Sequence, residues 1–586
     1  MDSFNLRQEF LDFFEKKGHK IVPAYSLIPS DASVLFTTSG MQQFKPYYLK
    51  GESLFGKKVA NCQKCLRTSD INDVGDKSHL TFFEMLGNFS FDDYFREETV
   101  KLALEFLLEV CSLSIDRMWF SYFKGDSQAP EDIKSKKVLL SNNILEKRII
   151  AMGRKDNFWG PTGEEGPCGP TIDIYYDLTS IPCKKEEQCS LDCECGRFVE
   201  LWSLVFNEYY QDSAKKIFSI EEKGGKKGID TGLGLVRLAA ASQGKKTIFE
   251  TDLFQPLIDI IDRDKNSKES RIIADHIKAS CFLISEGIIP SKVDKGYILR
   301  RLLRKAIRCK RILQGGNNLL TDLAKKVIEL YKDIYPELKS KQEEILTIIQ
   351  KEEEDFSKAL DRGLIQFEKL LKEQQSEKII SGKNAFILFE TYGFPLELTE
   401  ELAQERGFLV DKEGFNNALN EHQKISRAGA EKKFGGIGKE AEEKEAINLH
   451  TATHLLHSAL RKILGDSARQ MGSDINRERL RFDFSFDRKL TDEEIERIEH
   501  LVNEKIKADL VIEKENMLLK DALESGAMSF FKEKYPERVS VYSIDDFSKE
   551  ICAGPHAKHT SELGNFKIIK QESVGSGIRR IKAILN

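Results

Sequence analysis

Two pairs of metal-binding side chains lie near the end of the sequence. His450 and His454 stand four positions apart, so a helix would place both imidazoles on one face, where they can bind the same ion. Cys552 and His556 form a second pair with the same spacing. A single histidine on a helix face is more often a surface or core residue than a ligand, but the two pairs together make up a tetrahedral Cys/His set. The sequence therefore predicts that these four residues bind zinc.

A second group of thiols consists of Cys183, Cys189, Cys193 and Cys195, with charged residues between them. The chain carries 11 cysteines but no secretion signal, and thiols inside cells are kept reduced, so a disulfide framework is not expected. The density of this group favours a structural zinc site. Cys62-Gln-Lys-Cys65 has no second pair nearby, and we interpret it as unrelated to metal binding.

Basic side chains are concentrated between residues 295 and 311, where the sequence has eight Lys or Arg and no Asp or Glu. At helical spacing the apolar residues form one stripe, and the other face carries Arg300, Arg301, Arg304, Lys305 and Arg308. A run of charge is usually just a solvated face. In a chain with a net charge of -5, however, a patch of one sign favours contact with phosphate and predicts a nucleic-acid partner.

Length and composition limit the class of protein. With 586 residues the chain is too long for one core, which predicts three or four domains. Hydrophobic residues make up 40% of the chain, but charge interrupts them everywhere, and neither an apolar run of membrane-spanning length nor a signal peptide is present. We therefore expect a monomeric, cytoplasmic protein that does not enter a membrane.

The periodicity of apolar residues changes along the chain and predicts an α+β multidomain protein. Residues 1–255 mix helices and Gly/Pro turns with short strands such as Val34–Thr38. Residues 256–428 have helical periodicity and predict an all-α domain. Residues 429–446 are rich in glycine and charge, which suits a linker, and residues 447–586 predict a separate α/β domain.

Three stretches resemble the motifs of class II aminoacyl-tRNA synthetases, and specifically those of the alanine family. Residues 26–44, which end in Leu-Phe-Thr-Thr-Ser-Gly-Met-Gln-Gln-Phe, are similar to motif 1. Residues 62–91 contain Phe-Phe-Glu-Met-Leu-Gly-Asn-Phe-Ser-Phe and look like motif 2, while residues 229–237 (Ile-Asp-Thr-Gly-Leu-Gly-Leu-Val-Arg) look like motif 3. The resemblance implies a catalytic domain built on an antiparallel sheet, then a helical tRNA-recognition domain and an α/β editing domain.

The resemblance also implies a reaction: ATP with Mg²⁺ activates alanine, which is then transferred to tRNA(Ala). Alanine's carboxylate attacks the α-phosphate, and both groups are anionic, so fixed guanidinium groups must neutralise the transition state. The family pattern gives this role to Arg67 and Arg237, and gives the alanine ammonium to Asp230. It also places in the ATP and alanine site Glu84, Met85, Trp159, Val205, Gly232 and Gly234.

An editing site is expected because an alanine pocket excludes glycine by only about 1 to 3 kcal/mol and rejects serine's hydroxyl only about a hundredfold. The resemblance assigns hydrolysis of mischarged Ser- and Gly-tRNA(Ala) to residues 447–586, which hold the zinc predicted above. It also places Gln470 in the editing pocket. Arg579 and Arg580 are candidates for contact with the phosphates of the acceptor end.

Several positions depart from the family pattern. The family reads a G:U pair of the acceptor stem through an Asn and an Asp, and this chain has Lys292 and Glu390 there, so we expect weaker discrimination. Ser203 and Val236 replace a usual Asn and Glu. No segment corresponds to the family's β-barrel before the editing core or to its C-terminal domain, so the resemblance is to a short form.

Two other interpretations fit parts of the sequence. A threonyl-type class II enzyme would explain Pro555 before His556, but in that family the editing domain precedes the catalytic domain. A tRNA-binding or trans-editing protein without synthetase activity would be favoured by loss of Arg67 or Arg237, and both are present.

Overall fold

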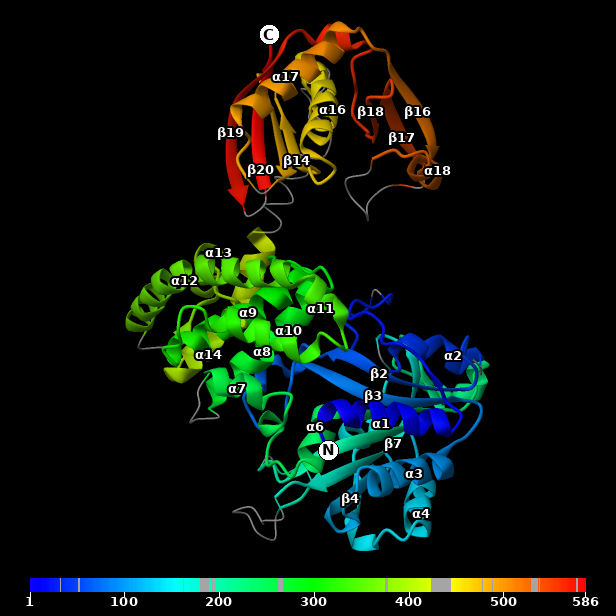
Figure 1. Cartoon of the computed structure of the whole chain (residues 1–586). Helices are drawn as coiled ribbons and strands as arrows, with labels where there is room; N and C mark the ends of the chain where they lie inside the picture. Colours follow the sequence, from blue (N-terminus) through cyan, green and yellow to red (C-terminus); the bar gives the residue numbers. More distant parts are fainter. Residues whose placement is uncertain are drawn as a thin grey trace. The chain divides into compact units, whose positions relative to one another are not determined.

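The computed structural model of the chain describes residues 1–586 except 32, 51–52, 162, 180–188, 192, 194, 262–266, 375–377, 423–443, 477, 487, 529–535, 537 and 576–577. The described residues form two compact units, one of residues 1–380 with 387–409 and one of residues 381–386 with 410–586. Most of the predicted linker lies outside the described residues. The mixed α/β architecture with a mainly antiparallel sheet confirms the predicted fold class (Figure 1).

The first unit contains a large sheet whose main path is β1-β2-β3-β11-β8-β7-β4-β5. Only β1/β2 and β4/β5 pair in parallel along this path; off it, β6 and β9 pair with β7, and β10 pairs with β9. The strands are β1 (Lys20–Ile21), β2 (Lys58–Leu66), β3 (Phe82–Phe91), β4 (Met118–Phe123), β5 (Ile149–Met152), β6 (Phe158–Trp159), β7 (Gly166–Asp177), β8 (Phe198–Asn207), β9 (Tyr209–Gln211), β10 (Ile217–Ser219) and β11 (Gly228–Gly234). This order makes β3, β11, β8 and β7 neighbours although they are far apart in the sequence.

Helices cover this sheet and begin where their sequences supply caps and apolar faces. α1 packs on β2, β3 and α6, as Figure 1 shows for β2 and β3. Its N-cap Asp2 accepts a hydrogen bond from the Asn5 backbone, and its buried face includes Leu6, Phe10 and Phe14. The helices of this part are α1 (Ser3–Lys16), α2 (Lys45–Lys50), α3 (Arg96–Glu105), α4 (Ile133–Ser141), α5 (Arg154–Asn157) and α6 (Leu235–Ser242).

The expected strand at Val34–Thr38 is not formed. Its backbone hydrogen-bonds in a loop, where the Thr37 N–H donates to the Leu27 carbonyl over 2.9 Å and the Leu66 N–H donates to the Thr37 carbonyl over 2.8 Å. By contrast, the apolar run Phe82–Phe91 is the central strand β3, in which only Phe83 is not buried. Both runs have high β-propensity, but only Phe82–Phe91 has neighbouring strands to pair with, and Val34–Thr38 does not form a strand.

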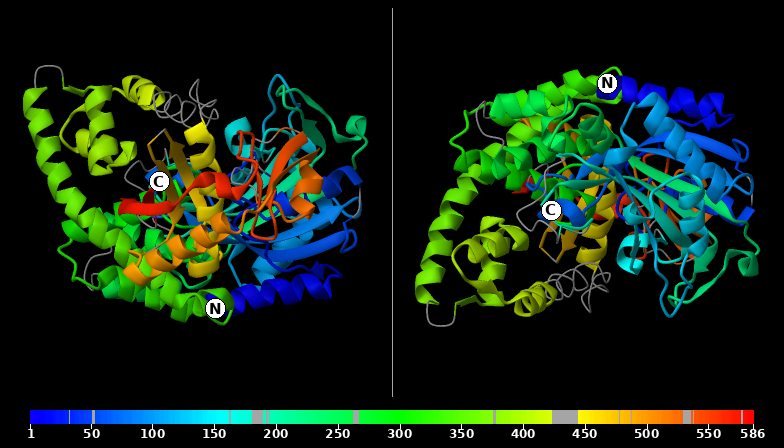
Figure 2. Two further views of the ribbon diagram at one scale, coloured as in Figure 1. Left: turned by 90° about the horizontal axis from the view of Figure 1, so that it is seen from above. Right: turned by 90° about the horizontal axis from the view of Figure 1, so that it is seen from below.

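Helices form the remainder of the first unit and gather at one side of the sheet (Figures 1 and 2). The predicted apolar stripe of α9 is buried, with Leu299, Leu302 and Leu303 fully inaccessible. The helices are α7 (Gln255–Ile261), α8 (Lys268–Ser285), α9 (Asp294–Ile312), α10 (Leu319–Tyr331), α11 (Pro336–Ser340), α12 (Gln342–Glu373), α13 (Gly382–Tyr392) and α14 (Leu396–Glu405), with one short strand pair, β12 (Ile379–Ile380) and β13 (Leu409–Val410). The start of α13 and the last residue of β13 are counted with the second unit.

The second unit is an α/β structure with two sheets. One has the order β14-β15-β20-β19 and the other β16-β17-β18. Its elements are α16 (Lys444–Leu464), β14 (Gln470–Ile475), β15 (Leu480–Ser485), α17 (Asp492–Lys507), β16 (Ile512–Leu518), α18 (Leu519–Glu524), β17 (Arg538–Ile544), β18 (Ser548–Ile551), β19 (Phe566–Gly575) and β20 (Ile578–Leu585). Helix α16 packs on both sheets and therefore positions its histidines against β18. In the described part of the chain, no helix combines the length and apolar character needed to cross a membrane.

Candidate functional sites

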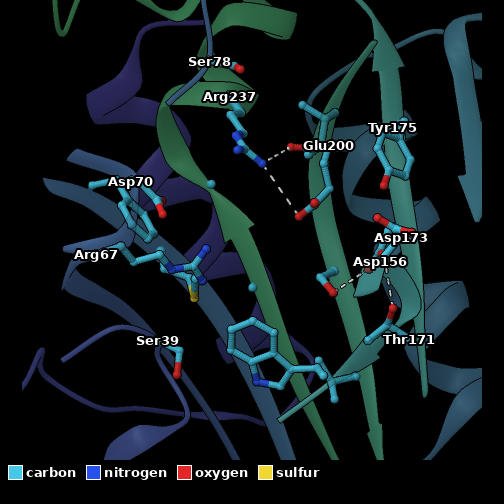
Figure 3. A pocket seen from close by; sticks show the side chains of 18 of the residues that line it. Ser39, Arg67, Asp70, Ser78, Asp156, Thr171, Asp173, Tyr175, Glu200 and Arg237 are labelled. Carbon is cyan, nitrogen blue, oxygen red and sulfur yellow. Dashed lines mark hydrogen bonds and ion pairs between the residues drawn. The ribbon is translucent and has the colours of Figure 1, made fainter. Parts of the chain in front are cut away.

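A pocket of about 300 Å³ opens over the strands β3, β11, β8 and β7 of the first unit. Figure 3 shows side chains from these strands and their flanking loops converging on it. Of the residues predicted for the ATP and alanine site, all but Glu84 line this pocket, namely Arg67, Met85, Trp159, Val205, Asp230, Gly232, Gly234 and Arg237. The sheet order thus joins segments that the three motifs place far apart.

Arg67 follows directly after β2 and lies between two aromatic rings. Its guanidinium carbon is 5.1 Å from the ring centre of Phe83 and 5.5 Å from that of Trp159. Its Nε donates to the Thr38 carbonyl over 3.3 Å. Stacking of this kind fixes the plane of the guanidinium while leaving its remaining N–H groups available to an anion.

Arg237 is held in the first turn of α6 by β8. Its Nη1 donates to the Glu200 carbonyl over 3.0 Å and lies 3.7 Å from the Glu200 carboxylate (Figure 3). Both groups are partly exposed to solvent in the pocket, so this ion pair is only a weak constraint. The pocket therefore carries two guanidinium groups from different strand ends.

Asp230 is a buried carboxylate on β11. The residue is only 4% exposed, and among the described residues its carboxylate has no hydrogen-bond or ion-pair partner. Burial raises the pKa of Asp230 to about 7. A desolvated carboxylate without a partner is unfavourable, so the site favours a ligand that brings a positive charge.

Asp173 on β7 is a pocket residue that sequence reasoning missed. Its carboxylate accepts hydrogen bonds from Ser203 Oγ at 2.6 Å and Asn157 Nδ2 at 2.8 Å, and burial together with Glu200 raises its pKa well above the ordinary value. A signal was present in the sequence, because Thr171, Asp173 and Tyr175 alternate with apolar residues and so share one face of a strand. All of them line the pocket.

Gly232 allows close packing at the floor of the pocket. A Cβ at this position would lie 3.0 Å from Met85 Sδ, and the Gly40 N–H approaches the same sulfur at 3.4 Å. Gly234 pairs with Met85 across the β11–β3 register. The absence of a side chain at Gly232 therefore lets Met85 pack closely against β11.

The prediction that Glu84 belongs to the ligand site is wrong. Its side chain is fully buried on the opposite face of β3, where Arg7 Nη2 lies 2.7 Å from it and the Tyr335 hydroxyl donates over 2.9 Å. The reason is strand alternation, because Phe83 and Met85 face the pocket and Glu84 must then face away. This carboxylate instead joins α1 and the chain just before α11 to the sheet.

In the second unit, His450, His454, Cys552 and His556 converge. One potential ligand atom of each lies within 4.8 Å of those of the others. His450 Nε2 is 3.4 Å from Cys552 Sγ, and the Nε2 atoms of His454 and His556 are 2.9 Å apart. Although burial opposes it, the three imidazoles lower the pKa of the Cys552 thiol to about 3, which favours the thiolate. The donor set of three nitrogens and one sulfur fits zinc.

Glu550, which was not predicted, contacts His454 of this cluster and the neighbouring His457. Its carboxylate lies 2.7 Å from His454 Nδ1 and 2.8 Å from His457 Nδ1, and it is almost fully buried. A carboxylate on Nδ1 leaves Nε2 of His454 directed at the other ligands. No pattern in a sequence so rich in Glu distinguishes this one. Gly554 is also required, since a Cβ there would lie 2.3 Å from the His450 ring.

The other predicted editing residues lie on β14 (Gln470) and β20 (Arg579 and Arg580). In the described structure, no hydrogen bond or ion pair joins Gln470, Arg579 or Arg580 to the four ligand residues. Arg580 makes a two-pronged ion pair with Asp483, at 2.7 and 2.8 Å. Arg579 is the next residue of β20, so strand alternation directs its side chain to the opposite face of the sheet.

The basic face of α9 is not free, contrary to expectation. Arg304 Nε lies 2.7 Å from Glu352 and Lys305 Nζ lies 2.7 Å from Glu401, and both basic residues are buried. The other three predicted residues are also paired with acids of α12 and α14: Arg300 with Glu352, Arg301 with Glu397, and Arg308 with Glu401 and Glu405. Acidic residues 48 to 97 positions away neutralise the run, which its local sequence could not reveal.

Lys292 and Glu390 are both exposed and belong to the same region of the first unit. Lys292 lines a shallow depression with Arg300, Arg301 and the loop at Gly393. Thr391, which follows Glu390, donates its hydroxyl to that carboxylate over 2.9 Å. Unlike the paired side chains of α9, these two groups remain available to a partner.

Three of the four predicted thiols of the second group are described, and Cys183 lies outside the described residues. Cys189, Cys193 and Cys195 lie in the connection between β7 and β8, and their sulfur atoms are all within 4.8 Å of one another. The structure therefore brings these three together.

Comparisons with known proteins cover both units. Residues 5–469 match the family described as tRNA synthetases class II (A), and residues 539–582 match the threonyl and alanyl tRNA synthetase second additional domain. The alanine–tRNA ligase of Borreliella afzelii is 46% identical, over 99% of this chain and 99% of that protein. Those of Treponema pallidum and Thermotoga sp. (strain RQ2) are 43% and 38% identical, over 99% and 100% of this chain and 97% and 80% of theirs.

Proposed function

The chain belongs to the alanine–tRNA ligases, a family of class II tRNA synthetases, and we propose that the pocket of Figure 3 makes alanyl-adenylate as the intermediate. The observation that carries this proposal is Asp230, a buried carboxylate without a partner, in a pocket with two guanidinium groups. An amino acid and ATP together supply the missing cation and the anions that this arrangement lacks.

In the proposed activation step, the alanine carboxylate attacks the α-phosphate of ATP and pyrophosphate leaves. Asp230 holds the ammonium, Arg67 neutralises the α-phosphate, and Arg237 binds the γ-phosphate end. Glu200 and Asp70 line the pocket and would supply the carboxylate oxygens that Mg²⁺ prefers, and the ion would neutralise phosphate charge there. A terminal ribose hydroxyl of the tRNA then attacks the adenylate carbonyl and releases AMP. No protein side chain forms a covalent bond in either step.

For recognition of tRNA, we propose that Lys292 and Glu390 contact the acceptor stem. Lys292 can only donate hydrogen bonds and adds a charge that can reach a phosphate, whereas Glu390 supplies an acceptor for a guanine amino group. Because the acids of α12 and α14 neutralise the cations of α9, that helix is better suited to position this surface than to bind phosphates itself.

For the second unit, we propose hydrolysis of mischarged Ser- and Gly-tRNA(Ala). The support is the set His450, His454, Cys552 and His556, whose nitrogen and sulfur donors suit Zn²⁺. When bound, zinc would position the tRNA end or an attacking water. Glu550 fixes the orientation of His454, and Gly554 leaves room for the His450 ring.

Substitution of the two pocket arginines tests the activation step. Arg67→Ala and Arg237→Ala should each reduce alanine-dependent ATP–pyrophosphate exchange by about 10²-fold or more, the usual effect of removing one oriented donor. Arg406→Ala is a matched control, because this exposed arginine of the same unit pairs with Glu368 at 2.8 Å and does not line the pocket. Equal activity in all three variants would contradict the proposed roles.

A further inference from the structure

The connection between β7 and β8 carries the thiols of Cys189, Cys193 and Cys195. Each is half-buried, and Cys189 Sγ and Cys195 Sγ are 3.8 Å apart. Neither the activation pocket nor the His/Cys cluster of the second unit includes these residues.

The sulfur separation distinguishes between two kinds of chemistry. A disulfide requires its sulfurs to be about 2.05 Å apart. Tetrahedral zinc with Zn–S bonds of about 2.3 Å places two thiolate sulfurs roughly 3.8 Å apart. Cys189 and Cys195 already have the second separation, and Cys193 Sγ lies within 4.8 Å of both.

The surroundings of the thiols favour a site with net negative charge. Three thiolates around Zn²⁺ carry a net charge of -1. Arg197 contacts Cys189, and its guanidinium also lies 2.7 Å from Asp177 at the end of β7. The Lys77 side chain lies against Gly196, whose φ of +75° favours glycine and where a Cβ would be 2.9 Å from Lys77 Cδ. Two basic side chains therefore lie near the cysteines, Arg197 in contact with Cys189 and Lys77 against the residue after Cys195.

We propose that Cys189, Cys193 and Cys195 bind a structural zinc ion that fixes the connection between β7 and β8. Soft thiolates select zinc over Mg²⁺ or Ca²⁺, and three of them leave one tetrahedral position for a further ligand. The two strands meet immediately beyond the site, where Asp177 pairs with Phe198, and two register positions farther on Tyr175 pairs with Glu200. Since Tyr175 and Glu200 line the activation pocket, the ion stabilises one of its walls.

Counting zinc in the full chain tests this site separately from the site in the second unit. The His454→Ala/Cys552→Ser variant serves as the background because it removes two ligands of the other cluster. After gel filtration under reducing conditions without chelator, mass spectrometry should find one zinc per chain in this background. Addition of Cys189→Ser and Cys195→Ser should remove that zinc. Addition of Cys62→Ser, a half-buried thiol outside the cluster, should retain it.

Cobalt substitution of the background variant gives a second measurement that needs no change at the thiols. Co²⁺ should produce thiolate-to-metal charge-transfer absorption, and addition of Zn²⁺ should abolish it. Absence of zinc and of this absorption from the background, iron in place of zinc, or a Cys189–Cys195 disulfide in the reduced protein would each overturn the proposal. Pyrophosphate exchange is measured in a separate assay. A failure of the proposed activation step can therefore be distinguished from a failure of the proposed zinc site.

Discussion

The protonation of Asp230 gives the most quantitative prediction about the activation pocket. Burial raises its pKa to about 7, and only the ionised carboxylate can pair with an ammonium. The ionised form of a carboxyl is lost as the pH falls through its pKa. With a pKa of about 7, roughly nine-tenths of the free sites are ionised at pH 8 and roughly one-tenth at pH 6. The KM for alanine should therefore rise about tenfold between pH 8 and pH 6.

The assay is alanine-dependent ATP–pyrophosphate exchange, with the KM of alanine and of ATP measured in parallel. Asp230→Asn should raise the alanine KM at pH 8 by about 10- to 150-fold, as expected for a charged hydrogen bond of about 1.5 to 3 kcal/mol, and should remove most of the pH dependence. The ATP KM should not follow the same profile.

Two matched variants separate Asp230 from its neighbours in the pocket. Asp173→Asn changes a second buried carboxylate, which already accepts hydrogen bonds from Ser203 and Asn157. His79→Asn removes another titrating group, whose pKa is raised by a hydrogen bond to Asp76. Both variants should keep the tenfold change in alanine KM. A flat wild-type profile, or an unchanged slope in Asp230→Asn, would refute the assignment of the ammonium to Asp230.

Three further predictions concern other parts of the molecule. Glu84→Gln leaves Arg7 buried without its charge partner and should lower the free energy of unfolding by about 3 to 5 kcal/mol. The control Glu368→Gln, in an exposed pair with Arg406, should lower it by no more than about 1 kcal/mol. Equal urea midpoints for the two variants would contradict this prediction. Glu550→Gln should weaken zinc binding in the second unit about 10- to 100-fold and slow deacylation of Ser-tRNA(Ala), while pyrophosphate exchange stays unchanged. A loss of exchange in folded protein would show that the two functions are not separate. Aminoacylation of tRNAs with G:U, G:C or A:U at the recognised pair should show a G:U preference below the usual value of about 1 to 3 kcal/mol per base pair. A full preference that is lost in Glu390→Gln but unchanged in Lys292→Ala would exclude a role for Lys292.

The pocket could be predicted largely from the sequence because its residues belong to short, continuous motifs. Arg67 lies directly after β2, Arg237 lies in the first turn of α6 after β11, and Asp230 lies on β11 at the centre of the sheet. Sheet order then brings these positions together without further information. The pairing of His450 and His454 with Cys552 and His556 was accessible for the same reason, since each pair is local and only the meeting of the pairs is long-range.

Residues whose role depends on distant partners could not be predicted. Glu84 had the local features of a site residue, but Arg7 and Tyr335, which pair with it, lie 77 and 251 positions away. Arg304 and Lys305 had the features of a phosphate-binding face, and only the fold shows that Glu352 and Glu401 neutralise them. The ion pairing of a basic run is a property of tertiary structure, whereas sequence shows only its charge.

The central claim is that the pocket activates alanine, and ATP–pyrophosphate exchange with each of the twenty amino acids tests it most directly. The buried carboxylate of Asp230 suits the ammonium of an amino acid, and membership of the alanine–tRNA ligases predicts that alanine is the best substrate, with weak activity for serine and glycine. Exchange that is driven best by threonine, or no exchange with any amino acid, would contradict the account.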